Sequence, residues 1–422
     1  MSNALTHIET EKRSAERSRS KLVPALRFNE FEGEWHYEFF ESFLNDKNAL
    51  AYGVLQPGED VEGGVPMLRT VDLNDFGLKN DTVLLRIPKK LDEQYKRTKL
   101  AGGELIISVM GTLGRTIIVP PEWNGWNVNR ALAVARLNES IDKWFLIQTI
   151  RSPKFVKKVI EEALGSAQKR INLGDLKEYK FTIPPLPEQQ KIASFLIAVD
   201  EKTQKLTKKK ALLEQYKKGV MQQLFSGQLR FKNENGNLYS DWEWVGGNEL
   251  FNNISDKKHN SDLPILAITQ DQGAIPRELI NYQMTVTEKS VASYKVVQIG
   301  DFVISLRTFQ GGIEFSDYHG ICSPAYIILR PSSDDVDRTY YKFYLKTSYY
   351  IKQLQKNLEG IRDGKMISYK YFSEIKIPFP SHPEQQKIAT YLSSIDTKIE
   401  AVTNQITQTQ TFKKGLLQQM FV

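Results

Sequence analysis

The sequence contains a single cysteine, Cys322, among its 422 residues. One thiol excludes an intrachain disulfide and a cysteine-based zinc site. The five histidines are scattered without metal-ligand spacing, so no metal site is expected. No apolar run approaches the ~20 residues that a membrane-spanning helix needs. Residues 1–27 are charged and lack the apolar core of a signal peptide, and we therefore expect a cytoplasmic protein.

Motifs for catalysis are also missing. No glycine-rich turn suits S-adenosylmethionine, and neither Pro-Pro pair follows the Asn or Asp of an amino-methyltransferase motif. Gly364-Lys365 is followed by Met366, so the chain has no P-loop there. Glu178-x-Lys180 and Glu374-x-Lys376 match part of a nuclease signature. No companion aspartate supports them, and we place both on the solvent face of a strand. We therefore predict no catalytic residue.

The charge balance is basic. The chain has 57 Lys and Arg against 50 Asp and Glu, which gives a net charge of +7 and a pI near 9.0. This balance indicates, weakly, a polyanionic partner. The hydrophobic fraction of 41% and the charged fraction of 25% are typical of a globular protein.

One stretch of sequence occurs twice. Residues 187–200 read PEQQKIASFLIAVD and residues 383–396 read PEQQKIATYLSSID, so nine of fourteen positions are identical. At the same offset of 196, KKGVMQQLF at 217–225 returns as KKGLLQQMF at 413–421. The repeat unit is therefore about half of the chain, which indicates a duplication.

Each copy of the repeat predicts a long helix. A proline followed by glutamate is favourable in a first helical turn. Apolar residues then recur every seven positions in the first copy, and a 4-3 alternation with a polar gap at Thr409 and Lys413 runs through the second. Such a seam is typical of a coiled coil, whereas the alternative is an ordinary amphipathic core helix. The heptad positions of the first copy are Ile192, Val199, Leu206, Leu213 and Val220.

Before each copy of the repeat lies a region with short strands separated by glycine turns, and each region leads into a predicted helix, 142–163 or 338–359. The fold class is thus α+β: two duplicated β-rich domains with short helices, separated by two long antiparallel coiled-coil helices in a pseudo-two-fold arrangement. The predicted organisation is a polar, basic arm over 1–22, a first β-rich domain over 23–186, a long helix over 187–227, a second β-rich domain over 228–382 and a long helix over 383–422.

The helical parts align without gaps, whereas the β-rich parts diverge. A shared scaffold with two different surfaces suggests two binding modules, and DNA has a local two-fold symmetry that suits a pseudo-two-fold protein. Half-sites read from one side would lie roughly one helical turn, about 10 bp, apart.

PEQQKIA after an IPxP strand in both halves, the FEGEW start and the KKGxxQQ(L/M)F end together resemble the specificity subunit of type I restriction-modification systems. The resemblance covers residues 23–422 and implies that each β-rich domain is a target recognition domain for one half of a split DNA site. It also implies that the helices set the spacer and dock two methyltransferase subunits, to which two restriction/translocase subunits are added. No cofactor is expected on this chain, since S-adenosylmethionine, ATP and Mg²⁺ would belong to the partner subunits.

Candidate DNA contacts are polar and basic residues near glycine turns, because such side chains contact phosphates and base edges. In the first half these are Arg69, Thr70, Thr112, Arg115, Asn127, Asn129, Arg130, Gln168, Lys169 and Arg170. In the second half they are Gln270, Gln272, Arg307, Thr308, Gln310, Arg362 and Lys365. The basic loops at 168–170 and 362–365 are the preferred candidates, since both halves keep positive charge beside a glycine there.

Two identical partners require two equivalent sites, so the most similar residues of the two halves are predicted to dock them. These are Pro187, Glu188, Gln189, Gln190, Leu224 and Phe225 in the first copy, and Pro383, Glu384, Gln385, Gln386, Met420 and Phe421 in the second.

Two other functions stay open. A coiled-coil scaffold with non-specific DNA binding would show a steep salt dependence without discrimination between sequences. A nuclease acting alone would cut DNA with a metal ion and lose activity in Glu178→Ala or Glu374→Ala.

Overall fold

The computed structural model describes residues 22–163, 170–260, 262–280, 291–356 and 367–422. The chain forms two compact units: unit 1 comprises Met1–Thr207 with Asn404–Val422, and unit 2 comprises Lys208–Thr403. Each unit therefore contains one β-rich region, the start of one long helix and the end of the other.

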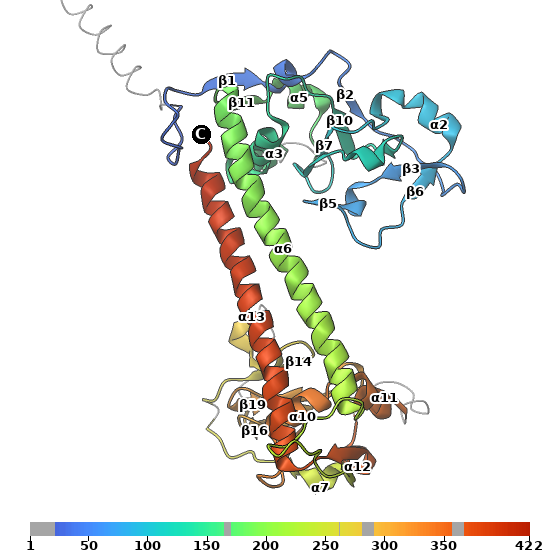
Figure 1. Ribbon diagram of the computed structural model, residues 1–422, viewed down its shortest axis with the longest axis vertical. Coiled ribbons are helices and arrows are strands. Elements are labelled where there is room, and N and C mark those ends of the chain that lie inside the picture. The colour runs from blue at the N-terminus through green and yellow to red at the C-terminus, as the bar shows by residue number, and fades with distance from the viewer. Residues whose placement is uncertain (1–21, 164–169, 261, 281–290, 357–366) are drawn as a thin grey trace, which may run out of the picture. The chain divides into compact units, whose positions relative to one another are not determined.

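Both predicted long helices are present, as α6 (Leu186–Phe225) and α13 (His382–Gln419) (Figure 1). In unit 1, Leu196 near the start of α6 shares a core with Leu416 near the end of α13. In unit 2, Val220 near the end of α6 shares a core with Leu392 near the start of α13. The two helices therefore run antiparallel within each unit, which confirms the predicted pairing.

An ion pair joins the helices in each unit, and the two pairs are equivalent at the offset of 196. In unit 1 the Lys413 ammonium lies 2.6 Å from Oδ1 of Asp200, and in unit 2 the Lys217 ammonium lies 2.6 Å from Oδ1 of Asp396. Burial lowers the pKa of Lys413, although its bond to Asp200 opposes that shift. Lys413, which interrupts the apolar positions of α13, is therefore paired with Asp200 on α6.

The β-rich regions share one sheet topology. Each unit contains a four-stranded antiparallel sheet, ordered β2-β10-β7-β8 in unit 1 and β13-β20-β17-β18 in unit 2. The strands of unit 1 are β2 (Leu50–Tyr52), β10 (Leu132–Ala135), β7 (Leu105–Ser108) and β8 (Thr116–Ile118). Those of unit 2 are β13 (Phe251–Ile254), β20 (Ile327–Pro331), β17 (Phe302–Ile304) and β18 (Glu314–Phe315). The duplication therefore extends through the parts of the sequence that diverge.

A two-stranded ribbon leads into each long helix. β1 (His36–Phe39) pairs with β11 (Lys180–Ile183) in unit 1, and β12 (Glu243–Gly246) pairs with β21 (Lys376–Phe379) in unit 2. Tyr37 faces Thr182, and Trp244 faces Pro378. Because Thr182 and Pro378 differ by 196, the two ribbons have the same register.

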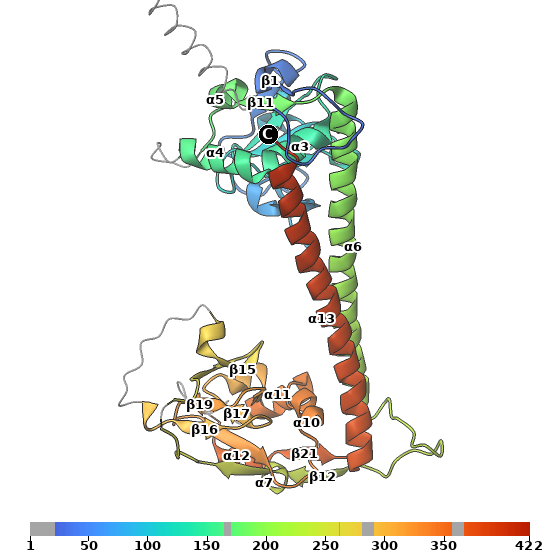
Figure 2. The same cartoon turned by 90° about the vertical axis from the view of Figure 1, so that its left-hand side faces the viewer.

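Each predicted helix over 142–163 and 338–359 is two helices, so the single-helix prediction was wrong. Unit 1 has α3 (Lys143–Arg151) and α4 (Pro153–Ala163), and unit 2 has α10 (Arg338–Tyr344) and α11 (Ser348–Lys356) (Figure 2). Ser152 has ψ of 144°, which is extended, because a residue before proline is disfavoured in the α conformation.

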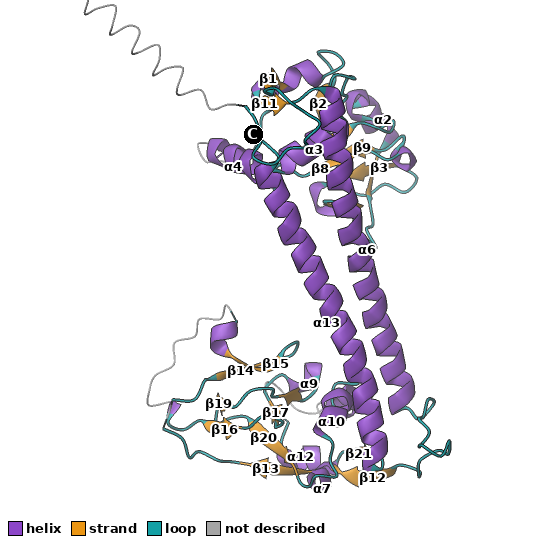
Figure 3. Cartoon of the chain, turned by 60° about the vertical axis from the view of Figure 1, so that its left-hand side comes forward, coloured by secondary structure: helices purple, strands orange, loops and turns teal. Residues whose placement is uncertain are grey.

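The remaining elements lie outside these sheets and ribbons, and several of them are strands of smaller sheets (Figure 3). In unit 1 they are η1 (Phe40–Phe43), β3 (Val65–Leu68), η2 (Thr70–Asp72), β4 (Leu73–Asn74), β5 (Gly77–Leu78), β6 (Leu85–Ile87), α2 (Lys89–Gln94), η3 (Lys96–Thr98), η4 (Pro121–Trp123), β9 (Asn127–Val128) and α5 (Leu173–Glu178). In unit 2 they are α7 (Gly247–Leu250), β14 (Leu266–Thr269), β15 (Gly273–Pro276), η5 (Arg277–Leu279), β16 (Lys295–Val297), α9 (Thr308–Gly311), β19 (Gly320–Cys322) and α12 (Tyr369–Glu374).

Glu178 and Glu374 end the short helices α5 and α12, so their predicted placement on a strand was wrong. In the described part of the chain, none of the helices combines the length and the apolar character needed to cross a bilayer.

Candidate nucleic-acid interface

The connection between β7 and β8 in unit 1 carries Thr112 on an exposed turn. Gly111 and Gly114 have φ of +77° and +76°, a backbone conformation that residues other than glycine rarely adopt. The amide of Ser108 donates to the carbonyl of Arg115 at 2.7 Å and closes the turn. Thr112 is therefore presented to solvent on a tight, defined hairpin.

Arg115, at the end of this hairpin, is committed to internal contacts. Its guanidinium lies 3.1 Å from Oδ1 of Asp75 and donates to the carbonyls of Leu73 and Thr70 at 2.9 and 3.4 Å. Arg69 is also paired, with Nη2 2.8 Å from Oδ1 of Asp72. The structure brings Arg69, Thr70 and Arg115 together, and the bonds of Arg115 hold the hairpin against the segment that follows β3.

Asn127 does not lie at a loop tip, so this part of the interface prediction was wrong. Its side chain is fully buried, and its amide donates to Oδ1 of Asp92 at 2.8 Å. Its carbonyl oxygen accepts from the hydroxyl of Thr98 at 2.7 Å. Asn129 is half-buried beside it, whereas Arg130 is exposed. Of these three polar residues, only Arg130 is fully presented to solvent.

Arg170 is exposed and lies beside the β7–β8 connection, since it forms an isolated bridge with Met110. The amide of Ile171 donates to the carbonyl of Val109 at 2.9 Å and holds this segment in place. Gln168 and Lys169, predicted with Arg170, lie outside the described residues. The same is true of Arg362 and Lys365.

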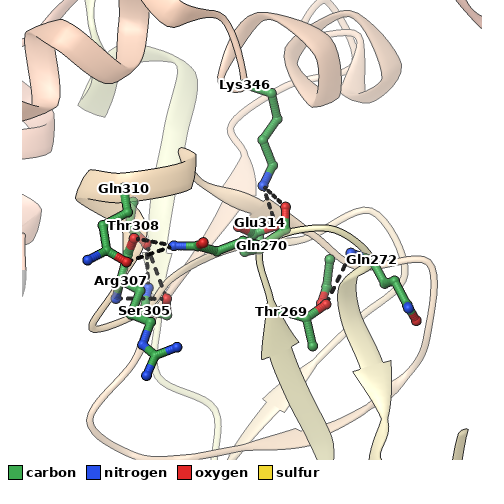
Figure 4. Close-up of polar contacts among 10 residues, drawn as sticks. Thr269, Gln270, Gln272, Ser305, Arg307, Thr308, Gln310, Glu314 and Lys346 are labelled. Carbon is green, nitrogen blue, oxygen red and sulfur yellow. Dashed lines mark hydrogen bonds and ion pairs between the residues drawn. The ribbon is translucent and has the colours of Figure 1, made fainter. Parts of the chain in front are cut away.

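In unit 2 the connection between β17 and β18 occupies the same place in the sheet and carries α9 (Figure 4). Gln270, from the turn after β14, meets it: the Gln270 amide donates to the carbonyl of Arg307 and to Oε1 of Gln310, both at 3.2 Å. A Cβ on Gly311 would lie 3.0 Å from Cγ of Gln270. The glycine therefore allows this close approach.

Three exposed side chains of this cluster keep free polar groups. The Arg307 guanidinium has no partner among the described residues and points away from Gln270 and Gln310 (Figure 4). Gln310 uses only its carbonyl oxygen, and Gln272 bonds to Thr269 only through its backbone amide, at 3.1 Å. The predicted residues Gln270, Arg307 and Gln310 are therefore adjacent and accessible.

Thr308 is the exception, and its prediction as a DNA contact was wrong. Its side chain is buried, and its hydroxyl accepts from the amide of Ser305 at 2.7 Å. This bond satisfies the backbone amide of Ser305, in the segment that leads from β17 into α9.

Sequence reasoning missed an ion pair beneath the cluster. Lys346 contacts the buried carboxylate of Glu314 and also donates to the carbonyl of Gln270 at 3.1 Å (Figure 4). Burial raises the pKa of Glu314, and the Lys346 ammonium opposes that shift. A glutamate at an apolar strand position (GGIEF) was the only signal, because its partner lies 32 residues away. This pair fixes the turn that carries Gln270.

Most of the predicted docking residues are internal, so that prediction was wrong for eight of them. Leu224, Phe225, Met420 and Phe421 belong to the two main cores. Glu188, Gln189, Glu384 and Gln385 are each at most 1% exposed. The four that remain exposed are Pro187, Gln190, Pro383 and Gln386.

The buried glutamates form one clamp that is built twice. In unit 1, Glu188 accepts from Nε and Nη2 of Arg27 at 2.8 and 2.7 Å and from the indole of Trp35 at 3.3 Å. In unit 2, Glu384 accepts from Nε and Nη2 of Arg230 at 3.1 and 2.9 Å and from the indole of Trp242 at 2.9 Å. The clamp raises the pKa of both arginines through these bonds. It ties the start of each long helix to the segment that leads into the first strand.

The buried glutamines extend the clamp to the helices packed on each sheet. Gln189 accepts from the amide of Asp142 at 2.8 Å, and Gln385 accepts from the amide of Asp337 at 2.9 Å. Asp142 and Asp337 are the N-caps of α3 and α10. The PEQQ identity is therefore explained by an internal junction that each unit needs.

The described residues contain no cluster of three or more His, Cys, Asp or Glu side chains that could hold a metal ion. The polar groups gathered on the two hairpins are amides, hydroxyls and guanidinium groups, which suit hydrogen bonding to base edges and phosphates.

The chain matches the type I restriction modification DNA specificity domain over residues 54–215 and 239–409. It is 28% identical over 377 residues to the putative type I restriction enzyme MjaX specificity subunit of Methanocaldococcus jannaschii, covering 84% of this chain and 85% of the relative. It is 29% identical over 216 residues to the type I restriction enzyme EcoBI specificity subunit of Escherichia coli. That match spans 49% of this chain and less than half, 45%, of the relative.

Two solved structures share the fold. The type I restriction-modification S subunit of M. genitalium has a TM-score of 0.55 at 16% identity and covers 95% of this chain and 99% of its own. A chain from a structural study of complex assembly and conformational transition of the type I restriction-modification system has a TM-score of 0.52 at 19% identity, with coverage of 91% and 96%.

Proposed function

Because the chain belongs to the type I restriction-modification DNA specificity family, we propose that it reads a bipartite DNA sequence, one half with each unit. It is a specificity subunit and not a catalytic subunit of such a system. The DNA specificity domain matches it twice, once in each half of the sequence.

The observation that carries the proposal is the contrast between two equivalent hairpins. The β7–β8 and β17–β18 connections occupy the same place in sheets with the same strand order. One presents Thr112 between glycines, and the other presents Arg307 and Gln310. A scaffold that binds DNA non-specifically has no reason to keep the sheet and change the hairpin, whereas two half-sites of different sequence require it.

The chemistry of the second hairpin suits base reading in the major groove. Glutamine amides pair with the N6 and N7 edge of adenine, and arginine pairs with the O6 and N7 edge of guanine. Gln310 keeps a free amide nitrogen and Arg307 keeps a free guanidinium among the described residues. Exposed Arg130 and Arg170 of unit 1 are suited to phosphates or bases beside the first hairpin.

The proposed partners are double-stranded DNA, two methyltransferase subunits and two restriction/translocase subunits. The paired helices would set the spacing between half-sites, roughly one turn or about 10 bp when both are read from one side. The methyltransferase subunits would flip a base out of the stack to modify it. S-adenosylmethionine, ATP and Mg²⁺ would be bound by those partners.

The test is single-molecule sequencing of adenine methylation in DNA from a methylation-deficient host. Cells expressing the methyltransferase partner alone are compared with cells that also express this chain. We expect a split motif, modified on both strands, only when this chain is present. A complex with the partner that modifies no motif would overturn sequence recognition and favour the scaffold with non-specific DNA binding.

A further inference from the structure

Each unit has a second turn beside the hairpin of its four-stranded sheet. In unit 1 it is side turn 1, residues 75–76, which connects the antiparallel strands β4 and β5. In unit 2 it is side turn 2, residues 270–272, which connects the antiparallel strands β14 and β15. Both turns follow the edge strand, β2 or β13, and precede β7 or β17 in the chain. The two side turns are therefore equivalent in chain order.

Each side turn is bonded to the neighbouring hairpin. In unit 1, Nε of Arg115 in the β7–β8 connection lies 3.1 Å from Oδ1 of Asp75 in side turn 1. In unit 2, the side-chain amide of Gln270 in side turn 2 donates to the carbonyl of Arg307, in the β17–β18 connection, at 3.2 Å. The side turn and the hairpin therefore lie side by side within each unit.

In unit 1 a cation from the bend between two helices holds side turn 1 against the sheet. Arg151 is the last residue of α3, directly before the break at Ser152. Its Nη2 donates to the carbonyl of Asp75 in side turn 1 and to the carbonyl of Thr116 in β8, both at 2.6 Å. A single guanidinium nitrogen therefore bridges the side turn and the strand that follows the hairpin.

Unit 2 obtains the same bridge from a different residue. Lys346 lies between α10 and α11, donates to the carbonyl of Gln270 at 3.1 Å and contacts the buried carboxylate of Glu314 in β18 (Figure 4). The offset of 196 pairs Arg151 with Thr347, whose hydroxyl instead donates to a carbonyl of α10. The cation of unit 2 thus lies one residue earlier and differs in type, yet it joins the same two elements.

Burying a charged group is unfavourable, and apolar packing in its place is often as stable or more stable. Both units nevertheless place a cation where it fixes one turn beside the hairpin. We propose that each side turn is a second DNA-reading element, and that Arg151 and Lys346 are positioning residues that set it against the hairpin. This role rests on the proposed function and adds residues to the surface that reads each half-site.

The two side turns present different chemistry. In side turn 1 the side chain of Phe76 is 54% exposed, and the Phe76 amide donates to Oδ1 of Asn74 at 2.8 Å. The carboxylate of Asp75 is paired with Arg115, so its charge is compensated next to a DNA backbone. Side turn 2 presents the exposed side chain of Gln272.

These side chains suit different bases. Phenylalanine makes apolar contact with the methyl group of thymine, whereas glutamine pairs with the N6 and N7 edge of adenine. Phe76 is therefore assigned to a thymine in the half-site of unit 1, and Gln272 to an adenine in that of unit 2. Two half-sites of different sequence require such a difference between equivalent turns.

The test measures methylation rates of the complex between the full chain and its methyltransferase subunit. One duplex carries the split motif that sequencing identifies, and each of the others has one base pair of one half changed. Arg151→Met and Lys346→Met remove one bridge each. We expect each to lower discrimination about tenfold, as the loss of a good base contact would, and the two variants to do so in opposite halves. Lost stability alone would slow methylation of all duplexes alike.

Conservative and matched variants separate the bridge from charge in general. Arg151→Lys and Lys346→Arg keep a cation with several donors and are expected to restore most of the discrimination. Lys342→Met is the matched control, because Lys342 lies on the neighbouring helix α10 and its ion pair, at 2.9 Å, is with Asp317 and not with side turn 2. It is expected to leave discrimination unchanged in both halves.

Phe76→Ala tests reading without touching the bridge and is expected to relax the same half as Arg151→Met. In that half, uracil in place of the contacted thymine should slow the wild-type complex but not slow Phe76→Ala further, because uracil lacks the methyl group. Val83→Ala is the control, since Val83 is an apolar residue of the same unit that is 86% exposed. If Arg151→Met unfolds unit 1, as hydrogen exchange would show, Phe76→Ala decides for that unit.

The outcomes distinguish this role from the proposed function. If the bridge variants keep full discrimination, if one of them relaxes both halves, or if Phe76→Ala discriminates like the wild type, the reading role of the side turns is contradicted while the proposed function stands. A wild-type complex that modifies no motif would contradict both.

Discussion

The two units place the same ion pair in different surroundings. In unit 1 Asp200, besides Lys413, accepts from the amide of Gln148 at 3.0 Å. In unit 2 the position equivalent to Gln148 is Tyr344, one of several buried tyrosines. There the ammonium of Lys217 lies 4.9 Å from the centroid of the Phe343 ring. The helix pair is thus constant, whereas the layer between it and the sheet varies.

The two units also differ in the contacts between the helices packed on each sheet and the hairpin. In unit 1 Arg151 donates to the carbonyls of Asp75 and Thr116, both at 2.6 Å, and burial lowers its pKa. The equivalent position in unit 2 is Thr347, whose hydroxyl donates only to the nearby carbonyl of Tyr344 at 2.8 Å. A polar network links helices to hairpin in unit 1, and an aromatic layer fills that place in unit 2. The layer between the helix pair and the sheet therefore differs between the units, while the clamp and the interhelical ion pair are kept in both.

The largest expected effect comes from breaking the clamp. Glu188→Ala leaves the guanidinium of Arg27, which is 12% exposed, without its carboxylate, and loss of one partner of a buried ion pair costs about 3–5 kcal/mol. Glu384→Ala should cost about the same in unit 2. Hydrogen exchange, which resolves local stability, should show lost amide protection only in the unit that carries the change.

Gln190→Ala and Gln386→Ala are the controls, since these exposed neighbours should change stability by less than about 0.5 kcal/mol. Equal loss of protection in both units from Glu188→Ala alone would show that the clamps are not separate.

The second effect should differ between the units. The side chains of Asp200 and Lys413 are 13% and 16% exposed, and Asp200→Asn should destabilise unit 1 by about 3 kcal/mol, at the low end for a buried pair. Asp396 is 44% exposed, so Asp396→Asn should cost less than about 1 kcal/mol, as for surface pairs. Hydrogen exchange at increasing urea concentration, read out separately for each unit, measures both losses of stability. A larger loss in unit 2 would contradict the role given to burial.

The third prediction separates recognition from support. Arg307→Ala should leave stability unchanged and weaken specific DNA binding by the partner complex, by about 1–3 kcal/mol for one good base contact. Arg115→Ala should instead destabilise unit 1, because Arg115 is bonded to Asp75 and two carbonyls. Fluorescence anisotropy with the cognate duplex, paired with thermal unfolding, distinguishes the two. A loss of stability in Arg307→Ala would instead assign Arg307 a role in the fold and contradict its role as a DNA contact.

The smallest effect concerns Cys322 in unit 2. Burial raises the pKa of its thiol to about 12, with Lys295 opposing. The folded state therefore keeps the proton while the unfolded state loses it above pH 9, so stability falls with rising pH, by up to about 1.4 kcal/mol between pH 9 and 10. Cys322→Ala should make this slope shallower in urea titrations at pH 8 to 10. The buried tyrosines of unit 2, whose pKa values burial also raises, account for the slope that remains. A slope as steep in Cys322→Ala as in the wild type would show that Cys322 does not contribute to it.

The long helices and their pairing were predictable from the sequence, because heptad spacing and a duplicated start and end are local signals. The role of the identical residues was not. Identity shows that two positions share a role, but not whether the role is internal, and the partner of Glu188 lies 161 residues away.

The candidate site was predictable only in part, for the same physical reason. Arg307, Gln270 and Gln310 lie together as expected of polar residues at glycine turns. Asn127 and Thr308 have the same side-chain chemistry but satisfy buried backbone or side-chain groups, and burial depends on contacts between distant segments. The break at Ser152 was a missed local signal, because Pro153 follows it.

The most direct test of the claim that each unit reads its own half-site is methylation sequencing with one hairpin altered. The complex carries Gln270→Ala, Arg307→Ala and Gln310→Ala together, and its modified motif is compared with that of the wild type. The account predicts that degenerate positions appear in one half of the motif only, with the other half and the spacing unchanged. Degeneracy in both halves, or an unchanged motif, would contradict it.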